Sequence, residues 1–377
     1  MAETRDHLAA LLRVTPGGAQ TRSKRASVLP PEFPDILTYG KGSRVWGPDG
    51  VTFYTDWICG LGAISLGYSF DLVDEAVRAQ IFDGGPSWSL PHRLELETSE
   101  LLLETLREHG LPHVEQVRWV KTGSEATVAA MMIARRVTGR DTILSIGYHG
   151  WHEAHLDRGS MSLINIPWGE PGILMEQFKE VSDETAGVLL EACRDTEPPA
   201  WYLQAIREFC VQNGALLIMD ECVTGFRWAI GGASEYFGIE PDLAVFGKGM
   251  ANGYPLACVV GPADTLSHAV DCSGTFGGEA VSLAAAGATI RTFREHDVIG
   301  HMASVGQEWI SSGEATGYPC HPRLTGNKEE VMAKAGILAR EGVLVHPAGF
   351  NVSFSHTREQ AQEAIRVLQA ARVSPLP

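Results

Sequence analysis

Two charged residues of this chain follow apolar runs that are typical of buried strands. Asp220 comes directly after the run Leu216–Met219, and Lys248 closely follows the run Leu243–Phe246. Because parallel strands share one carboxyl edge, both side chains are expected at the same edge of a sheet. A lysine amine forms a Schiff base with pyridoxal phosphate, and a buried carboxylate keeps the pyridine nitrogen of that cofactor protonated. The pair therefore indicates pyridoxal phosphate chemistry, although a solvated lysine or a helix-capping carboxylate explains either residue alone.

A turn of small residues is suited to bind the phosphate of such a cofactor. Thr122, Gly123 and Ser124 lie between the strand-like run Val117–Val120 and an amphipathic helix over Glu125–Val137. Backbone N–H groups at a helix start bind anions, and a glycine permits close approach. The alternative is that Ser124 only caps the helix and binds no ligand.

An aromatic residue follows a further strand-like run. Tyr148 comes after Thr142–Ile146, where its ring can stack on a heterocyclic cofactor. The neighbouring His149, with His152 and His155, raises the alternative of a metal site. No pattern of carboxylates or cysteines completes a set of metal ligands, so we expect no metal.

The composition excludes several classes of partner. The 377 residues are 44% hydrophobic, enough for a large core and two domains. The formal charge of −16 argues against a nucleic-acid surface and against binding to an anionic membrane. Seven scattered cysteines, no signal-peptide core and no apolar stretch of membrane-spanning length indicate a cytoplasmic protein.

The order of elements predicts the architecture. Between about residues 92 and 265, helical periods alternate with short apolar strands, which predicts a three-layer αβα domain with a mainly parallel sheet. We place this large domain at residues 58–275. The arm and hairpin of residues 1–57 and the C-terminal residues 276–377 then form a smaller α+β domain. Long helices are expected over Ala280–Glu295 and Glu359–Arg372.

The sequence resembles the class III aminotransferases of fold type I, especially the branch that includes glutamate-1-semialdehyde 2,1-aminomutase. The resemblance covers nearly the whole chain. Its motifs include Pro16–Gly18, the hairpin Trp46–Trp57, Gly123–Ala126, Tyr148–Gly150, Asp220–Glu221 with Thr224–Arg227, Gly247–Lys248, Gly274–Thr275 and Phe354–Thr357. This resemblance implies a fold type I transferase that uses pyridoxal phosphate.

Roles at the ring of the cofactor follow from the resemblance. Lys248 matches the Schiff-base lysine, which also serves as general base at the substrate α-carbon. Asp220 matches the partner of the pyridine nitrogen, and Tyr148 the aromatic that stacks on one ring face. The adjacent His149 falls in the same cofactor-binding motif. Glu191 matches an active-site glutamate at a strand end.

The resemblance also implies how the phosphate is held. Thr122, Gly123 and Ser124 match the phosphate cradle. Thr275 matches a threonine that reaches the phosphate from the neighbouring subunit, which implies a homodimer. Cys222 occupies the place usually held by a valine under the ring. A reactive thiol is the alternative for Cys222, but nothing nearby in the sequence is suited to be its base.

The same catalytic residues serve transaminases, aminomutases, decarboxylases and epimerases. The segment from His155 to Ile164 is short, and the longer loop that gates the aminomutase site is missing. An aminomutase must retain its intermediate between half-reactions, so we favour intermolecular transfer from an amino donor to an aldehyde or ketone acceptor. The acceptor is a keto sugar or an intermediate of specialised metabolism in this interpretation. Intramolecular transfer by an aminomutase is the alternative.

Three residues are weaker candidates for substrate contacts. Trp88 falls in the family's substrate-facing loop, where it either lines the pocket or packs under the loop. Lys24 and Arg25 fall where the aminomutase has a carboxylate-binding arginine. A lysine lacks the bidentate fork of arginine, and a solvated basic arm is the alternative for both residues. A different class, a cofactor-binding protein that has lost catalysis, would not need Lys248, Asp220 and the cradle together.

Overall fold

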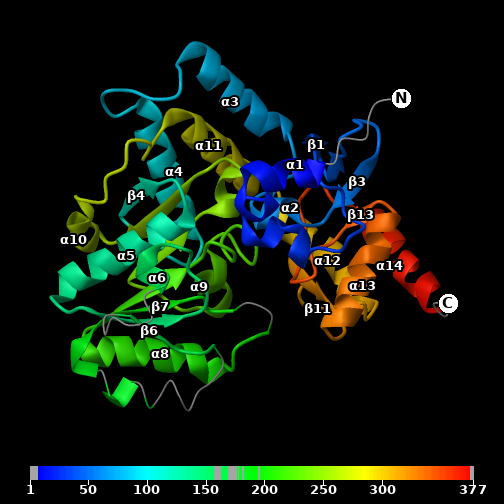
Figure 1. Cartoon of the computed structure of the whole chain (residues 1–377). Helices are drawn as coiled ribbons and strands as arrows, with labels where there is room; N and C mark the ends of the chain where they lie inside the picture. The colour runs from blue at the N-terminus through cyan, green and yellow to red at the C-terminus, as the bar shows by residue number, and fades with distance from the viewer. Residues whose placement is uncertain are drawn as a thin grey trace. The chain divides into compact units, whose positions relative to one another are not determined.

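The computed structural model describes residues 7–156, 163–168, 176, 178–180, 182–193 and 196–373 (Figure 1). These residues form two compact units. The large unit contains the described residues from Asp71 to Ile299, and the small unit those up to Phe70 and from Gly300 onward. Both junctions lie further along the chain than the expected bounds at residues 57 and 275. One reason is that α11 (Ala280–Glu295) packs against α3 (Asp71–Asp83) and α4 (Arg93–Glu108), which fixes it in the large unit.

A seven-stranded sheet forms the centre of the large unit, in the order β4-β10-β9-β8-β7-β5-β6. The strands are β4 (Gln116–Val120), β5 (Thr142–Ile146), β6 (Leu163–Asn165), β7 (Thr185–Leu190), β8 (Leu216–Asp220), β9 (Leu243–Phe246) and β10 (Ala257–Gly261). Only β10 runs opposite to the others, because it pairs antiparallel with both β4 and β9. The prediction of a mainly parallel sheet is therefore confirmed. The carboxyl ends of the other six strands share one edge.

Burial explains why these segments form strands. Every residue of β5, β7, β8, β9 and β10 is buried, as expected for a sheet covered on both faces. Helix α5 (Gly123–Thr138) packs on β7, β9 and β10, and α8 (Ala200–Asn213) packs on β7 and β8. Alanines of α5 and aliphatic side chains of the strands form one continuous core. This core holds the strand ends, and the loops that follow them, in fixed positions.

Shorter elements complete the large unit. They are α6 (Glu153–Leu156), α9 (Gly232–Phe237), α10 (Ala263–Leu266) and the 3-10 turns η4 (Ser182–Glu184), η5 (Lys248–Ala251) and η6 (Ser267–Ala269). Among the helices described, none is both long and apolar enough to cross a membrane.

The small unit is built on a four-stranded sheet in the order β1-β2-β3-β13 and a hairpin of two further strands. Its strands are β1 (Tyr39–Lys41), β2 (Arg44–Trp46), β3 (Phe53–Asp56), β11 (Ala315–Tyr318), β12 (His321–Leu324) and β13 (Val343–Leu344). Its helices are α1 (His7–Val14), α2 (Cys59–Gly62), α12 (Val298–Ser311), α13 (Lys328–Arg340) and α14 (Arg358–Val373), with 3-10 turns η1 (Pro16–Gly18), η2 (Arg22–Lys24) and η3 (Ala26–Val28). The predicted hairpin is confirmed, since β2 and β3 pair antiparallel.

Candidate active site

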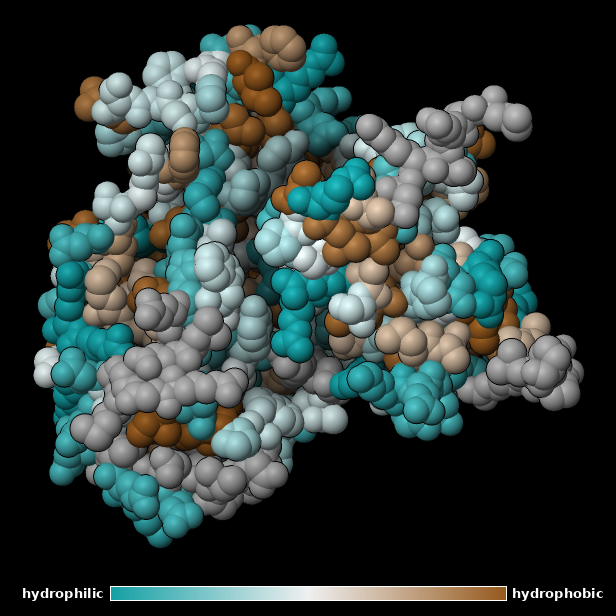
Figure 2. Space-filling view, in the orientation of Figure 1, coloured by the Kyte–Doolittle hydropathy of each residue, from teal (hydrophilic) through white to brown (hydrophobic). Residues whose placement is uncertain are grey.

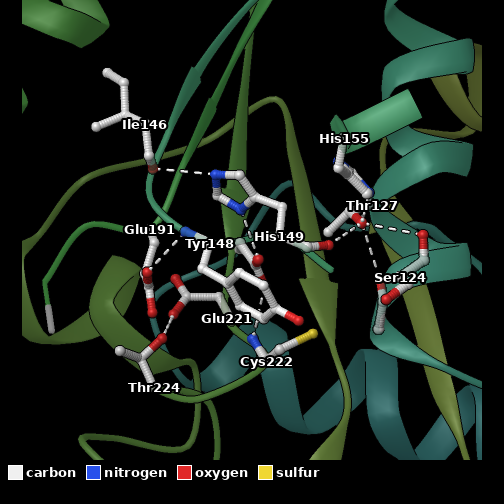
Figure 3. Close-up of polar contacts among 12 residues, drawn as sticks. Ser124, Thr127, Ile146, Tyr148, His149, His155, Glu191, Glu221, Cys222 and Thr224 are labelled. Carbon is white, nitrogen blue, oxygen red and sulfur yellow. Dashed lines mark hydrogen bonds and ion pairs between the residues drawn. The ribbon is translucent and has the colours of Figure 1, made fainter. Parts of the chain in front are cut away.

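The predicted chemical residues gather at the carboxyl edge of the large sheet. Asp220 is the last residue of β8, and Lys248 closely follows β9. Tyr148 follows β5, Glu191 follows β7, and the predicted cradle begins at Thr122, after β4. Figure 3 shows side chains from the loops after β5, β7 and β8 directed toward one another. The placement is the one that open α/β sheets use for ligands.

Asp220 is buried and ionised. Its Oδ2 accepts a hydrogen bond from Nδ1 of His149 over 2.8 Å, and its Oδ1 accepts one from the backbone N–H of Cys222 over 3.1 Å. Burial alone would raise the pKa of Asp220. The hydrogen bond and charge of His149, with the charge of Lys248, outweigh burial and hold that pKa below its ordinary value. The site therefore contains a fixed negative charge.

His149 is held from both sides of its ring. Nδ1 contacts Asp220, and Nε2 lies 3.1 Å from the backbone carbonyl of Ile146 (Figure 3). Both partners are acceptor oxygens, so the ring is held between a carboxylate and a backbone carbonyl. The sequence predicted His149 as a cofactor-binding residue. In this structure its contacts are with Asp220, whose orientation it fixes.

Glu221, the next residue, has a different environment. It is fully buried and accepts hydrogen bonds from the hydroxyls of Thr224 and Ser234 and from the backbone N–H groups of Ala233 and Ser234. Burial raises the pKa of Glu221, although these hydrogen bonds oppose the rise. The side chain thus anchors the loop after β8 to the start of α9. Asp220 and Glu221, although adjacent in the sequence, therefore have different roles: Asp220 places a charge in the site, and Glu221 stabilises the loop.

Tyr148 presents its ring to the site, and Glu191 sets its backbone. Tyr148 is 61% exposed, whereas Glu191 is buried. Oε2 of Glu191 accepts a hydrogen bond from the backbone N–H of Tyr148 over 3.1 Å. A Cβ on the preceding Gly147 would lie 2.5 Å from that of Glu191, so only glycine fits there. Glu191 therefore acts on Tyr148 through the backbone.

Lys248 combines an exposed side chain with a constrained backbone. The residues on either side, Gly247 and Gly249, are buried, but Lys248 itself is exposed. Its φ of 41° lies in the left-handed region, which is uncommon for residues other than glycine. Turn η5, which begins at Lys248, packs against α11. Lys248 is therefore an exposed residue on a constrained backbone.

The start of α5 is arranged to bind an anion. Thr122 caps the helix by accepting from the N–H of Glu125, and Glu125 Oε2 accepts from the N–H groups of Lys121 and Thr122. Within the described part of the chain, the N–H groups of Gly123 and Ser124 have no acceptor. Two open amides at the start of a long helix fit a phosphate group. The residues present therefore fit pyridoxal phosphate.

Cys222 lies between the cradle and the lysine turn. Its Sγ is 2.7 Å from where a Cβ on Gly123 would stand and 3.5 Å from where one on Gly247 would stand. Burial raises the pKa of the thiol well above its ordinary value. Such a thiol stays protonated and is a poor nucleophile. The geometry thus favours packing over the reactive-thiol alternative.

His155, which the sequence did not assign to the site, ties its loop to the cradle helix. Nε2 of His155 lies 3.0 Å from Oγ1 of Thr127, and that hydroxyl is 2.8 Å from the carbonyl oxygen of His149 (Figure 3). Burial and the nearby His149 charge lower the pKa of His155 to about 4. In the described ranges, no group of three or more histidine, cysteine or acidic residues is arranged to hold a metal.

Four residues that the sequence predicted for the site make none of the contacts described above. Thr275 is exposed in a loop that lines a hollow of about 380 Å³ beside the cradle. Trp88 is 55% exposed and stacks on His92 with ring centroids 5.2 Å apart. Lys24 and Arg25 belong to the small unit, where Lys24 ends η2. Their predicted roles remain predictions.

Fold and site together fit an enzyme that depends on pyridoxal phosphate. The sequence model of a family described as "Aminotransferase class-III" matches residues 172–316. The chain is 32% identical over 345 residues to 3-aminobutyryl-CoA aminotransferase of Cloacimonas acidaminovorans, covering 84% of this chain and 82% of the relative. It is 33% identical over 328 residues to glutamate-1-semialdehyde 2,1-aminomutase of Natronomonas pharaonis, covering 79% and 71%.

A solved structure extends the likeness to almost the whole fold. The pyridoxal phosphate internal aldimine form of the FumI protein from Sphingopyxis sp. MTA144 superimposes with a TM-score of 0.89 at 28% identity, covering 97% of this chain and 94% of that one. The chain belongs to the class III aminotransferase family, and its cofactor is pyridoxal phosphate. The predicted family, fold class and cofactor are confirmed.

Proposed function

We propose that this protein is an aminotransferase that moves an amino group from a small-molecule donor to an aldehyde or ketone acceptor. Bound pyridoxal phosphate supplies a carbonyl that condenses with amines and a ring that withdraws electrons from the substrate α-carbon. One observation carries the proposal. The exposed amine of Lys248 shares a sheet edge with the ionised Asp220 and with the open amides of Gly123 and Ser124.

Each residue has a distinct proposed task. Lys248 binds the cofactor and then moves the proton at the substrate α-carbon, for which its amine must be unencumbered. Asp220 supplies the negative charge that holds a protonated pyridine nitrogen. The cradle amides hold the phosphate, and Tyr148 covers a ring face. Glu191 positions Tyr148 through the 3.1 Å contact to its backbone.

The choice between intermolecular and intramolecular transfer rests on the loop after β5. Only eight residues separate His155 from Ile164 in the sequence, so the connection between them is short. A short connection offers little chain to enclose an intermediate. The second candidate, a glutamate-1-semialdehyde 2,1-aminomutase, is supported by relatives of that name at 28–33% identity. We favour the transaminase, with a keto sugar or an intermediate of specialised metabolism as acceptor.

A homodimer is part of the proposal. Apolar side chains are exposed on α3 and on the loop after it, where Figure 2 shows hydrophobic surface: Ile81, Phe82, Trp88 and Leu90. This loop lies beside the segment of Thr275 and the exposed Phe276, because the carbonyl oxygen of Pro86 accepts from the N–H of Ala280 over 2.9 Å. Exposed apolar surface of this extent favours a protein partner. A second copy would cover it and receive Thr275 at its phosphate.

Substrate contacts are the least constrained part of the proposal. Trp88 is an accessible aromatic on the same exposed loop, and we propose that it contacts substrate. Lys24 is exposed and Arg25 is half-buried, so Lys24 is the better candidate to meet a substrate carboxylate. Single substitutions of these residues should raise KM for one substrate more than they lower kcat.

A single-turnover experiment tests the proposal. Purified holoprotein is mixed with single amine donors and no acceptor, and the released carbonyl product is measured. A transaminase releases about one equivalent of product per site, and Lys248→Ala should release none. An aminomutase would instead convert glutamate 1-semialdehyde to its isomer without net release of carbonyl. If an ¹⁵N-labelled donor never passes its label to any acceptor, intermolecular transfer is wrong.

A further inference from the structure

An ion pair joins two segments with proposed roles in phosphate binding: the cradle of the chain's own site and the loop of Thr275, which would reach the phosphate of a second copy. Lys121 immediately precedes the cradle, and Glu279 follows the loop of Thr275. Nζ of Lys121 lies 2.8 Å from Oε1 of Glu279 and 3.2 Å from the hydroxyl of Ser282. Their side chains are only 18% and 13% exposed, so the pair is largely shielded from water.

Each partner is fixed on its own element. The N–H of Lys121 donates to Glu125 Oε2 over 2.8 Å, within the capping box that opens α5. Glu279 caps α11, because its carboxylate accepts from the N–H groups of Val281 and Ser282 over 2.8 and 3.0 Å. Helix α11 is almost entirely buried. The ion pair thus connects the cradle to a rigid helix.

Charge and packing both hold the Lys121–Glu279 ion pair in a fixed geometry. Burial alone would raise the pKa of Glu279, but hydrogen bonds from Lys121, Ser282 and Val281, together with the charge of Lys121, outweigh it and hold that pKa low. The intervening loop also lies against β4, since a Cβ on Gly277 would stand 3.1 Å from the carbonyl oxygen of Trp119. A partly buried pair with additional hydrogen bonds holds geometry better than an exposed one.

We infer that Lys121 and Glu279 are positioning residues for the cofactor phosphate. Their ion pair sets the open amides of Gly123 and Ser124 against α11 and fixes the loop of Thr275 as one piece with the cradle. The inference rests on the proposed role of the cradle. Neither residue touches the ring end of the site, where Asp220 and His149 lie. Loss of the pair therefore weakens binding of the phosphate and leaves recognition of the ring unchanged.

The affinity for pyridoxal phosphate relative to pyridoxal tests this inference, because pyridoxal lacks only the phosphate. Holoproteins are stripped of cofactor with hydroxylamine, and rebinding of each compound is titrated without donor or acceptor. We expect Lys121→Met to weaken pyridoxal phosphate binding about tenfold and to change pyridoxal binding by less than about twofold. Glu279→Gln keeps a capping oxygen but loses the charge, and should act in the same direction. The double variant should be little worse than either single one.

Two controls separate positioning from general stability. Lys121→Arg keeps the charge and should restore most of the affinity ratio. Arg207→Met removes another half-buried pair, the 2.7 Å contact to Asp242, and should lower stability without changing the ratio. An equal loss for both compounds in Lys121→Met, or the same fall in the ratio in Arg207→Met, would overturn the inference. If Lys121→Met does not fold, Glu279→Gln provides the ratio. The measurement involves no turnover, so it stands even if the transferase reaction is intramolecular.

Discussion

The ring end and the phosphate end of the candidate site are built in different ways. At the ring end, Asp220, Glu221 and His149 are buried, and each is hydrogen-bonded within the chain. At the phosphate end, Thr122 is exposed, Gly123 and Ser124 are half-buried, and a hollow opens beside them. The first end consists of buried, hydrogen-bonded side chains, whereas the second consists of residues that are partly exposed.

The difference follows from what each end must bind. A permanent charge such as that of Asp220 costs too much to bury unless hydrogen bonds and an opposite charge are already in place. A phosphate arrives with its own charge and needs N–H groups that are still free. At the ring end, the hydrogen-bond partners of the charged group are therefore already in place. At the phosphate end, only the backbone N–H groups are in place. Substitutions should act on chemistry at the first end and on cofactor affinity at the second.

Among substitutions that leave Lys248 in place, Asp220→Asn should have the largest effect. The substitution keeps the shape of the side chain but removes the negative charge, so the protonated state of the ring nitrogen loses its partner. We expect kcat/KM to fall about 10²–10³-fold, the range found when one group that stabilises developing charge is removed. Steady-state kinetics with the donor found in the single-turnover screen measure this. If the variant keeps more than about a tenth of the activity, the charge of Asp220 is not essential.

Glu221→Gln is the matched control at the neighbouring carboxylate. Glutamine offers one acceptor where Glu221 accepts from two hydroxyls and two N–H groups, so buried donors lose partners. We expect the free energy of unfolding to fall by about 2 kcal/mol. Urea unfolding measures it, and kcat at saturating cofactor should change far less than in Asp220→Asn. A loss of kcat equal to that of Asp220→Asn would mean that the two carboxylates share one role.

Apolar runs made the ring end predictable from sequence. Strands β5 and β9 and helix α11 have the predicted bounds, because fully buried strands and a long apolar helix leave a continuous local pattern. Asp220 and Lys248 then follow from where their strands end. The direction of β10 has no such signal, since buried runs look alike in both directions. Strand β6 is a three-residue edge strand and was missed.

Long-range pairs at the phosphate end left no local signal. Lys121 and Glu279 are 158 residues apart, and each alone is an ordinary charged residue near a helix start. The contact of His155 with Thr127 depends on how a loop folds back onto α5. The domain bounds differ for the same reason, since the packing of α11 on α3 and α4 is tertiary. Contacts of this kind require the fold before they become visible.

His155→Gln tests whether the contact between His155 and Thr127 of the cradle helix stabilises the fold in a pH-dependent way. An unfolded histidine takes up a proton near pH 6.5, whereas folded His155 does so only at about 4. Between these values the unfolded chain binds more protons, so the free energy of unfolding falls as the pH falls from about 6.5 to about 4. Glutamine does not titrate. Across this pH range, the free energy of unfolding of the variant should therefore fall by about 1 kcal/mol less than that of wild type, a value reduced because His155 is only partly buried.

Urea unfolding of wild type and His155→Gln across this pH range provides the comparison. His113 and His346 also have lowered pKa values, but both residues are present in wild type and variant, so their contributions to the pH dependence cancel in the comparison. The charged or titratable neighbours His149, His152 and Asp220 are likewise unchanged. Parallel curves for wild type and variant would show that His155 is not held neutral by the fold.

Cys222→Ala should have the smallest effect, although Cys222 lies between the two ends of the site. Its thiol packs beside Gly123 and Gly247, and burial raises its pKa, so it acts as a small apolar group. Removing one buried sulfur should lower the free energy of unfolding by about 1 kcal/mol and change kcat by less than about threefold. Kinetics and urea unfolding of the same preparation measure both. A loss of kcat close to that of Asp220→Asn would show that the thiol takes part in catalysis. The description of the site as a charged ring end and an open phosphate end would then be incomplete, because it omits a reactive group between them.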